Sequence, residues 1–186
     1  ILTYPVWCVS MAAFAVVCWA GFFRFDDQRR VLVRDVVVYD THLEVFVPQG
    51  KADQWRKGNV VVIATGVSAA CPVALCERLV GEGGLSRDAP LFQGFDGKAA
   101  VASLASGAEV PLSGEPITYA QARRWLLKGV AKVRGVTEKQ AAVFFGVHSL
   151  RAGGASAVAE VLAEANIPEH VFQMHGRWRS REAMLG

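Results

Sequence analysis

The residues best suited to chemistry are a histidine and an arginine, His148 and Arg151, which stand three positions apart. On a helix this spacing places both side chains on one face about one turn apart, so both can reach the same anion. The small residues that follow, Ala152–Ala157, would let a phosphate backbone approach this face closely. The same residues also describe an ordinary helix start with Ser149 as its cap and a solvated arginine. The pair alone does not decide between these interpretations.

Other basic and aromatic residues extend the pair into a larger set, namely Arg24, Lys51, His175 and Trp178. Such a set suits phosphoryl transfer in which fixed cations, rather than a metal ion, neutralise the phosphate. Arginines donate paired hydrogen bonds to the non-bridging oxygens, a lysine protonates the leaving oxygen, and a histidine takes or holds a proton. The set lacks a nucleophile.

Two members of the set also have plainer interpretations. Arg24 follows an apolar stretch and stands three residues before Asp27, which fits a surface ion pair at a helix end. Lys51 follows Gly50 in a polar segment, which fits a solvated loop lysine. The types of these residues therefore suggest a phosphate site without establishing one.

The composition and motifs indicate a globular domain and give no sign of a zinc site or a nucleotide-binding loop. The 186 residues are 52% hydrophobic and 20% charged, as is typical of a globular domain with a sizeable core. A net charge of +3 permits a nucleic-acid partner without arguing strongly for one. The four cysteines form no CxxC pair and have no histidine at zinc spacing, so we expect reduced thiols and no metal site. The sequence contains no P-loop and no GxGxxG motif.

The first element that must position these residues is the uncharged stretch Ile1–Phe23. We expect a fully buried helix from about Pro5 or Trp7 to Phe22, with Pro5 in its first turn. The stretch is also long enough for a membrane anchor, which remains the alternative.

The remaining chain predicts an α+β fold, mainly helical, with a small three-stranded antiparallel sheet. Three β-like runs, at 31–39, 43–47 and 59–63, form the sheet and carry Lys51 on the loop between the second and third. The segment 94–116 is small, polar and Gly-rich, which predicts an exposed loop or a short extra hairpin. Helices are expected at 70–80, 119–133, 148–165 and 167–174, the second of them capped by Thr118, and a last helix-like piece stops at Gly186.

Five short segments, taken in order along the chain, together resemble the tyrosine recombinases, the phage-integrase family. One matches the family's first-arginine box with an acidic residue three positions later, and another matches the segment that leads into its sheet. A third resembles its β-hairpin lysine, a fourth its most specific His-x-x-Arg box, and the last its His/Trp position. The five segments are Phe22–Asp27, Val31–Val36, Pro48–Gln54, His148–Gly153 and His175–Ser180.

The resemblance covers the chain from about Trp7 to Gly186 and implies the fold of the DNA breaking-rejoining enzymes. It implies site-specific recombination or integration, in which a tyrosine attacks DNA and forms a 3′-phosphotyrosine link without metal, ATP or other cofactor. By this resemblance, two arginines clamp the scissile phosphate, a lysine is the general acid and a histidine the proton acceptor. A tryptophan packs and hydrogen-bonds at the phosphate, with a nearby histidine as the alternative, and an aspartate orients the first arginine. In this sequence the implied residues are Arg24, Arg151, Lys51, His148, Trp178, His175 and Asp27.

One departure from the family concerns the nucleophile. Counting on from Trp178 at the family spacing places the catalytic tyrosine immediately beyond Gly186. The three tyrosines present, Tyr4, Tyr39 and Tyr119, fall in the first helix, the first strand and a later helix start. We therefore expect residues 1–186 to be a recombinase-like catalytic domain that ends before its nucleophile and lacks the family's amino-terminal DNA-clamping domain. Such a fragment would bind DNA and not cleave it.

The resemblance also carries expectations about partners and origin. The partner is double-stranded DNA, the full-length protein assembles into a tetrameric synapse, and no membrane is involved. The Gly176–Trp178 form and the loop at Lys51 are most similar to recombinases of eukaryotic mobile elements and their viral or algal relatives. The expected location is intracellular: the nucleus in a eukaryote, and otherwise the cytoplasm or nucleoid.

Three alternatives stay open from the sequence. The first is a domesticated, non-catalytic module that only binds DNA. The second is a type IB topoisomerase, which shares the chemistry but relaxes one supercoiled circle instead of joining two duplexes. The third is the membrane anchor at Ile1–Phe23.

Overall fold

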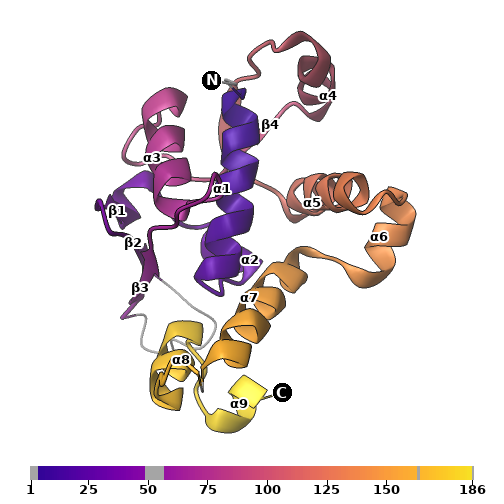
Figure 1. Cartoon of the computed structure of the whole chain (residues 1–186). Coiled ribbons are helices and arrows are strands. Elements are labelled where there is room, and N and C mark those ends of the chain that lie inside the picture. The colour runs from indigo at the N-terminus through magenta and orange to yellow at the C-terminus, as the bar shows by residue number, and fades with distance from the viewer. Residues whose placement is uncertain (1–3, 49–56, 163, 186) are drawn as a thin grey trace.

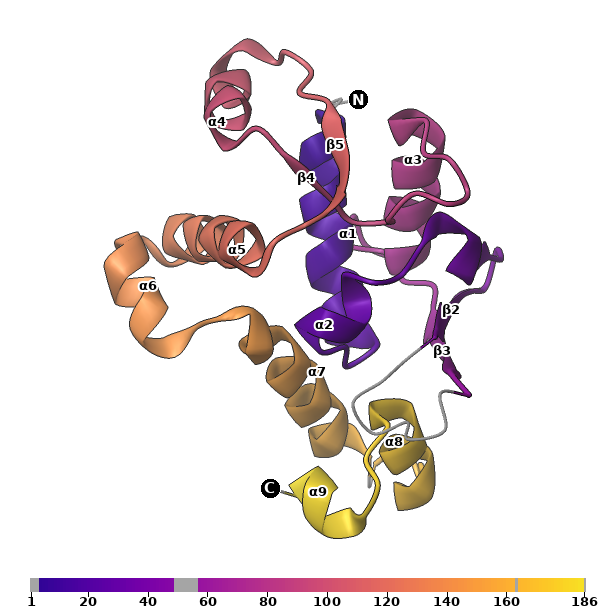
Figure 2. The same cartoon turned by 180° about the vertical axis from the view of Figure 1, so that it is seen from behind.

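The protein is built around one central helix, as the computed structural model of residues 4–48, 57–162 and 164–185 shows (Figure 1). This helix, α1 (Val6–Ala20), has a small sheet and a helix on one side and two further helices on the other. The C-terminal helices gather near its C-terminal end, and the view from behind shows the same arrangement (Figure 2). The prediction of a mainly helical domain with a small three-stranded antiparallel sheet is confirmed.

Helix α1 agrees closely with the predicted buried helix, since it starts directly after Pro5 and ends at Ala20. Apolar side chains cover it all round, which suits a helix packed on several sides rather than on one face. Its chain leaves the helix through Gly21 and then Phe22, which has a positive φ of 48°. In the described part of the chain, no helix combines the length and apolar character that crossing a bilayer requires.

The three-stranded sheet consists of β1 (Val36–Val38), β2 (His42–Val47) and β3 (Asn59–Ala64), in that order and antiparallel throughout. The first strand is shorter than predicted because Val33–Asp35 form a 3₁₀ turn. The Asp35 carboxylate accepts the Leu32 N–H at 3.0 Å, and the Val33 and Arg34 N–H groups bond to carbonyls of Ala89 and Arg87. These bonds draw the chain away from β2 before the ladder begins.

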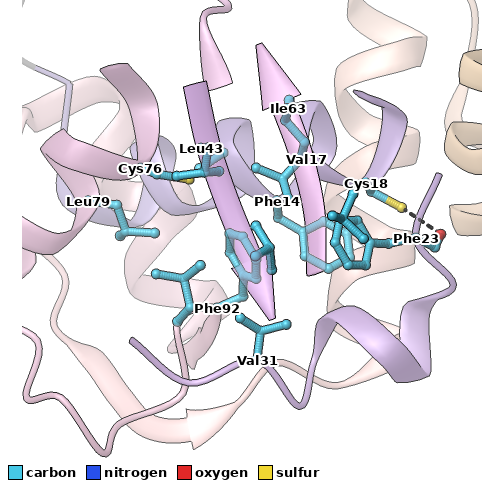
Figure 3. Packing of buried hydrophobic residues seen from close by; sticks show 14 of the residues in the cluster. Phe14, Val17, Cys18, Phe23, Val31, Leu43, Ile63, Cys76, Leu79 and Phe92 are labelled. Carbon is cyan, nitrogen blue, oxygen red and sulfur yellow. Dashed lines mark hydrogen bonds between the residues drawn. The ribbon is translucent and has the colours of Figure 1, made fainter. Parts of the chain in front are cut away.

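The main core lies between α1, the inner face of the sheet and α3 (Pro72–Gly83) (Figure 3). Phe14 and Val17 of α1 meet Leu43 of β2 and Ile63 of β3, whose side chains point to the same face of the sheet. Phe92 packs edge-on against Phe14 with ring centroids 5.5 Å apart. This packing fixes the axis of α1 and therefore the position of the turn at its C-terminal end.

Helix α3 begins with an unusual cap, the thiol of Cys71. The Sγ atom accepts hydrogen bonds from the N–H groups of Ala74 and Gly66 at 3.5 and 3.3 Å, and lies 3.3 Å from the hydroxyl of Thr65. Burial acts to raise the pKa of Cys71, but these hydrogen bonds together outweigh it and lower the pKa to about 7. Cys71 is only 6% exposed but lines an open surface cavity, so a small reagent can reach it. At Cys18 and Cys76, burial raises the pKa to about 12.

Alkylation of the folded protein is therefore expected to occur first at Cys71, with a half-maximal rate near pH 7, because only the thiolate reacts. Cys18 and Cys76 should stay protected until the protein unfolds. Iodoacetamide labelling across a pH series, read by mass spectrometry, measures this directly. Thr65→Val should move the Cys71 profile to higher pH. A Cys71 that reacts only above about pH 8.5, as a free thiol would, contradicts the account.

The segment expected as an exposed loop or hairpin, 94–116, contains a hairpin that encloses a helix. Strands β4 (Gln93–Phe95) and β5 (Leu112–Pro116) pair, and α4 (Gly97–Ser106) lies between them. Asp96 caps α4 through the N–H groups of Lys98 and Ala99. Ser103 lies buried and accepts the Trp7 indole N–H at 2.9 Å. The helix was not predicted because it buries small side chains instead of a stripe of large apolar ones.

The second half of the chain is helical, as expected, with one addition. Helix α5 (Tyr119–Arg134) begins at the predicted cap Thr118, and α7 (Val147–Val161) and α8 (Glu169–Gly176) correspond to the next two predicted helices. The short α6 (Glu138–Phe144), unpredicted, starts at a capping box of Thr137 and Gln140. A short α9 (Arg181–Leu185) ends the described chain.

Candidate phosphate-binding site

An open depression of about 610 Å³ lies where α7, the segment after α8, and the residue before α2 (Phe25–Gln28) meet. Four of the seven residues singled out from the sequence line it: Arg24, His148, Arg151 and Trp178. They come from three separate parts of the chain. The other described residues of the lining are Ala152, Ala155, Ser156, Arg177, Arg179, Ala183 and Met184.

The first turn of α7 presents His148 and Arg151 in different ways. Ser149 does cap this helix, because its hydroxyl accepts the Gly146 N–H at 3.0 Å. The buried Val147 fixes the turn, so His148 is exposed at the rim while Arg151, one turn later, is only 5% exposed. The first turn of α7 is therefore both an ordinary helix start with Ser149 in its capping box and a place where His148 and Arg151 can meet an anion.

Arg151 is held in place by the protein's own carbonyl groups. It donates to the carbonyl oxygens of Phe22 and, at 2.8 Å, of Gly176, and its guanidinium carbon lies 5.0 Å from the centre of the Trp178 ring. These two bonds use two of the five N–H groups of a guanidinium, which leaves donors for an anion in the depression. Burial, followed by repulsion from Arg24 and Arg177, lowers the pKa of Arg151 to about 10, so it stays charged at neutral pH.

Arg24 stands directly before α2 and lies about one-third exposed at the side of the depression. Its guanidinium is 4.0 Å from a carboxylate oxygen of Asp27, the residue expected to orient it. Asp27 is buried, and this same oxygen has no hydrogen-bond partner in the structure. At this oxygen, the nearby arginines therefore compensate the negative charge through space rather than through a formed hydrogen bond.

The segment after α8 separates His175 from Trp178. The Trp178 ring lines the depression and packs on Phe172 and Phe22, with ring centroids 5.1 and 6.0 Å away. His175 is not among the described lining residues: its Nε2 lies 2.8 Å from the Ala20 carbonyl oxygen and its ring is edge-on to Phe22. Burial lowers the pKa of His175, which favours the neutral ring. The structure thus places Trp178 at the site and His175 behind it.

The remaining predictions about the site have mixed outcomes. Lys51 lies outside the described residues, so its expected role stays a prediction. Of the small residues after Arg151, Ala152, Ala155 and Ser156 line the depression, as close approach of a large group requires. Gly154 instead faces the end of α1, where an added Cβ would overlap the Trp19 carbonyl. The missing side chain of Gly154 therefore lets α7 pack closely against α1, and it does not open the depression to a ligand.

Arg177 also lines the depression, although it was not predicted as a site residue; it stands inside the His175–Ser180 segment. It has a positive φ of 55° directly after α8 and lies mostly below the surface. No sequence pattern around His175 and Arg177 indicates that the Arg177 side chain points into the protein at the end of α8. Only the packing of α8 against the end of α1 reveals it.

The arrangement has the chemistry of an anion site. Four arginines and an exposed histidine line one open depression, and Asp27, the one buried carboxylate among the described residues, offsets part of the charge. Across residues 4–48, 57–162 and 164–185, no three His, Cys, Asp or Glu side chains lie close enough together to hold a metal ion. Fixed cations of this kind can bind a phosphodiester and stabilise charge that develops on it.

Comparison with known proteins identifies the fold. No family model and no curated protein matches the sequence. Among solved structures, the chain is similar to the XerH site-specific recombinase bound to its difH substrate in a pre-cleavage complex. The TM-score is 0.60 and the identity 16%, with 100% of this chain and 44% of that chain covered. The post-cleavage XerH complex with palindromic difH gives 0.56 and 11%, with 99% and 43% covered. The chain spans less than half the length of these recombinase chains, and it has a tyrosine-recombinase-like fold.

Proposed function

We propose that this chain belongs to the catalytic domain of a DNA recombinase and binds a phosphodiester of duplex DNA in the depression. The observation that carries the proposal is the gathering of Arg24, His148, Arg151 and Trp178 from three separate segments around one open depression. The likeness to recombinase structures bound to DNA supports the same partner.

In the proposed reaction, Arg24 and Arg151 bind the non-bridging oxygens of the scissile phosphate and offset the negative charge of its transition state. A tyrosine oxygen attacks phosphorus, and the bond from phosphorus to the 5′-oxygen breaks. Lys51 gives its proton to that oxygen, and His148 accepts the proton of the nucleophile. Attack by a 5′-hydroxyl on the 3′-phosphotyrosine reverses the steps and rejoins the strand, so no external energy source is consumed.

The nucleophile must come from outside the described site. Tyr4 and Tyr39 line other cavities, and Tyr119 packs edge-on against Phe25 at 5.3 Å. We infer that residues 1–186 bind DNA without cleaving it, and that a tyrosine elsewhere in the parent protein completes the reaction. Incubation with a nicked suicide duplex tests this: covalent protein–DNA adduct formed by residues 1–186 would contradict it.

The DNA partner also accounts for the charge on the outer surface. Helix α5 carries Arg123, Arg124, Lys128, Lys132 and Arg134, which can contact a phosphate backbone outside the depression. We propose that the parent protein assembles into a tetrameric synapse of two duplexes and comes from a eukaryotic or viral mobile element. Its proposed location is intracellular: the nucleus in a eukaryote, and otherwise the cytoplasm or nucleoid.

Arg24→Gln is expected to weaken binding of a fluorescent duplex about tenfold, because it removes one charged side chain that binds phosphate. The slope of log affinity against log salt should also fall by about 0.9 for each phosphate that the variant no longer neutralises. Fluorescence anisotropy at several salt concentrations measures both quantities. Arg78→Gln is the matched control, since Arg78 also pairs with a carboxylate but lies on α3, away from the depression.

Two outcomes of this binding experiment would contradict the proposal. Equal reductions of affinity in Arg24→Gln and Arg78→Gln would mean that DNA responds to net charge alone and that the depression is not the phosphate site. Absence of any duplex binding by the unchanged protein would contradict the proposed function altogether.

A second candidate is a domesticated module that binds DNA and cuts nothing. It is favoured by one observation, that none of the three tyrosines in the described chain lines the depression. Cleavage of a suicide duplex by the full-length parent protein separates the two candidates: adduct formation supports the recombinase, and binding without adduct supports the module.

A further inference from the structure

The C-terminal end of α1 is capped by cations from distant parts of the chain. The last carbonyl groups of a helix lack partners within the helix and form the negative end of its dipole. The final turn of α1 contains no basic residue of its own. Instead, side chains from α7 and from the end of α8, between 129 and 156 residues later, donate to the carbonyl of Gly21, the C-cap residue, and to that of Phe22 in the turn that follows.

Arg177 makes most of these bonds. Its two terminal nitrogens donate to the carbonyl oxygens of Gly21 at 3.0 Å, Phe22 at 2.8 Å and His175 at 3.1 Å. The guanidinium carbon lies 4.8 Å from the centre of the Phe23 ring. The residue reaches this position because its main chain turns into the left-handed region directly after α8. The forked end of Arg177 is therefore directed at the turn that follows α1.

The carbonyl of Phe22 connects Arg177 to both proposed phosphate ligands. It accepts hydrogen bonds from Arg177 and from Arg151, and it lies two residues before Arg24. Phe22 itself has a positive φ, which a bulky residue adopts only where its surroundings enforce it. The two guanidinium groups on its carbonyl are a physical means of enforcing it.

We propose that Arg177 is a positioning residue, which sets Arg24 and Arg151 for phosphate binding by clamping the turn Gly21–Phe23. It acts on Arg151 through the shared Phe22 carbonyl and on Arg24 through the chain direction of the turn. The ligand of the two arginines is taken from the proposed function. The clamp itself is a property of the free protein and does not depend on that ligand.

The first test needs no DNA. In ¹⁵N-arginine-labelled protein, Arg177→Gln and Arg177→Lys are compared with Arg78→Gln, which removes a cation that also bonds to a main-chain carbonyl. We expect the Nε–H signals of Arg24 and Arg151 to move in both Arg177 variants and to stay in place in the control. Lysine should move them less than glutamine, because it keeps the charge and one hydrogen bond to a carbonyl but has no fork.

The second test is a double-mutant cycle on duplex affinity. Arg177→Lys, the variant better able to fold, is expected to weaken binding about tenfold alone and less than about twofold in the Arg24→Gln background. Such coupling is typical of residues that act through one another. Additive reductions would mean that Arg177 contacts phosphate independently, and would overturn the proposal.

Two further results separate the possible failures. Unmoved Arg24 and Arg151 signals together with a lower unfolding midpoint would reduce Arg177 to a stabilising residue and overturn the positioning role. Moved signals in a protein that binds no duplex would support the clamp while contradicting the proposed function.

Discussion

Arg151→Met is expected to weaken duplex binding about a hundredfold while lowering the free energy of unfolding by only about 1–2 kcal/mol. Removal of a central charged group typically costs roughly 2–5 kcal/mol of binding, and a hundredfold is about 2.7 kcal/mol. The stability cost is smaller because two effects oppose each other. Two charge-assisted hydrogen bonds contribute about 1.5–3 kcal/mol each. Against this, the lowered pKa of Arg151, about 10, corresponds to roughly 3 kcal/mol of cost for burying the charge and holding it near Arg24 and Arg177.

Urea denaturation and fluorescence anisotropy on the same samples measure the two effects. Methionine is chosen because it retains a long apolar stem against Trp178. Arg34→Met is the matched control: it removes an arginine whose exposed pair with Asp88 should contribute less than about 1 kcal/mol, and it should leave affinity unchanged. A variant with reduced stability but wild-type affinity would mean that Arg151 only supports the fold.

Gly154→Ala is expected to destabilise the protein by about 3 kcal/mol or more, although alanine favours helices. The added Cβ would overlap the main-chain carbonyl of Trp19 and touch the Phe22 ring, and a main chain cannot move aside as a side chain can. Helices α1 and α7 would have to separate. Because Arg151 on α7 donates to the turn after α1, the site should be disturbed with them.

The neighbouring glycine provides the control on the same helix. A Cβ at Gly153 would meet the Trp19 indole at 3.6 Å, an ordinary contact. Gly153→Ala should therefore stabilise the protein by up to about 1 kcal/mol through helix propensity alone. Thermal unfolding of the two variants measures the difference. Equal effects of the two substitutions would contradict the close approach of α1 and α7.

Elements with a strong local pattern could be predicted from the sequence. The uncharged stretch before Arg24 predicted α1, and the Val-rich runs predicted the antiparallel sheet. The cap at Thr118 predicted the start of α5. In each case, local chemistry and tertiary packing favour the same structure, which is the condition under which sequence patterns are informative. Helix α4 lacks such a pattern, because its burial depends on Trp7, which stands 96 residues before Ser103.

The residues that line the site could be predicted from the sequence, but the contacts that hold them in place could not. The types and order of Arg24, His148, Arg151 and Trp178 indicated the phosphate chemistry, and the structure places them around one depression. The inward turn of Arg177 and the rear position of His175 follow from how α8 meets the end of α1. These hydrogen bonds span 155 residues of sequence, and no local pattern encodes them.

Titration of ¹⁵N-arginine-labelled protein with a short duplex measures whether this depression binds a DNA phosphate. We expect the Nε–H signals of Arg24 and Arg151 to shift together and saturate, while the signal of Arg78 on α3 does not move. Shifts confined to Arg123, Arg124 and Arg134 of α5, with Arg24 and Arg151 unchanged, would show that DNA binds elsewhere and would contradict the proposed phosphate site.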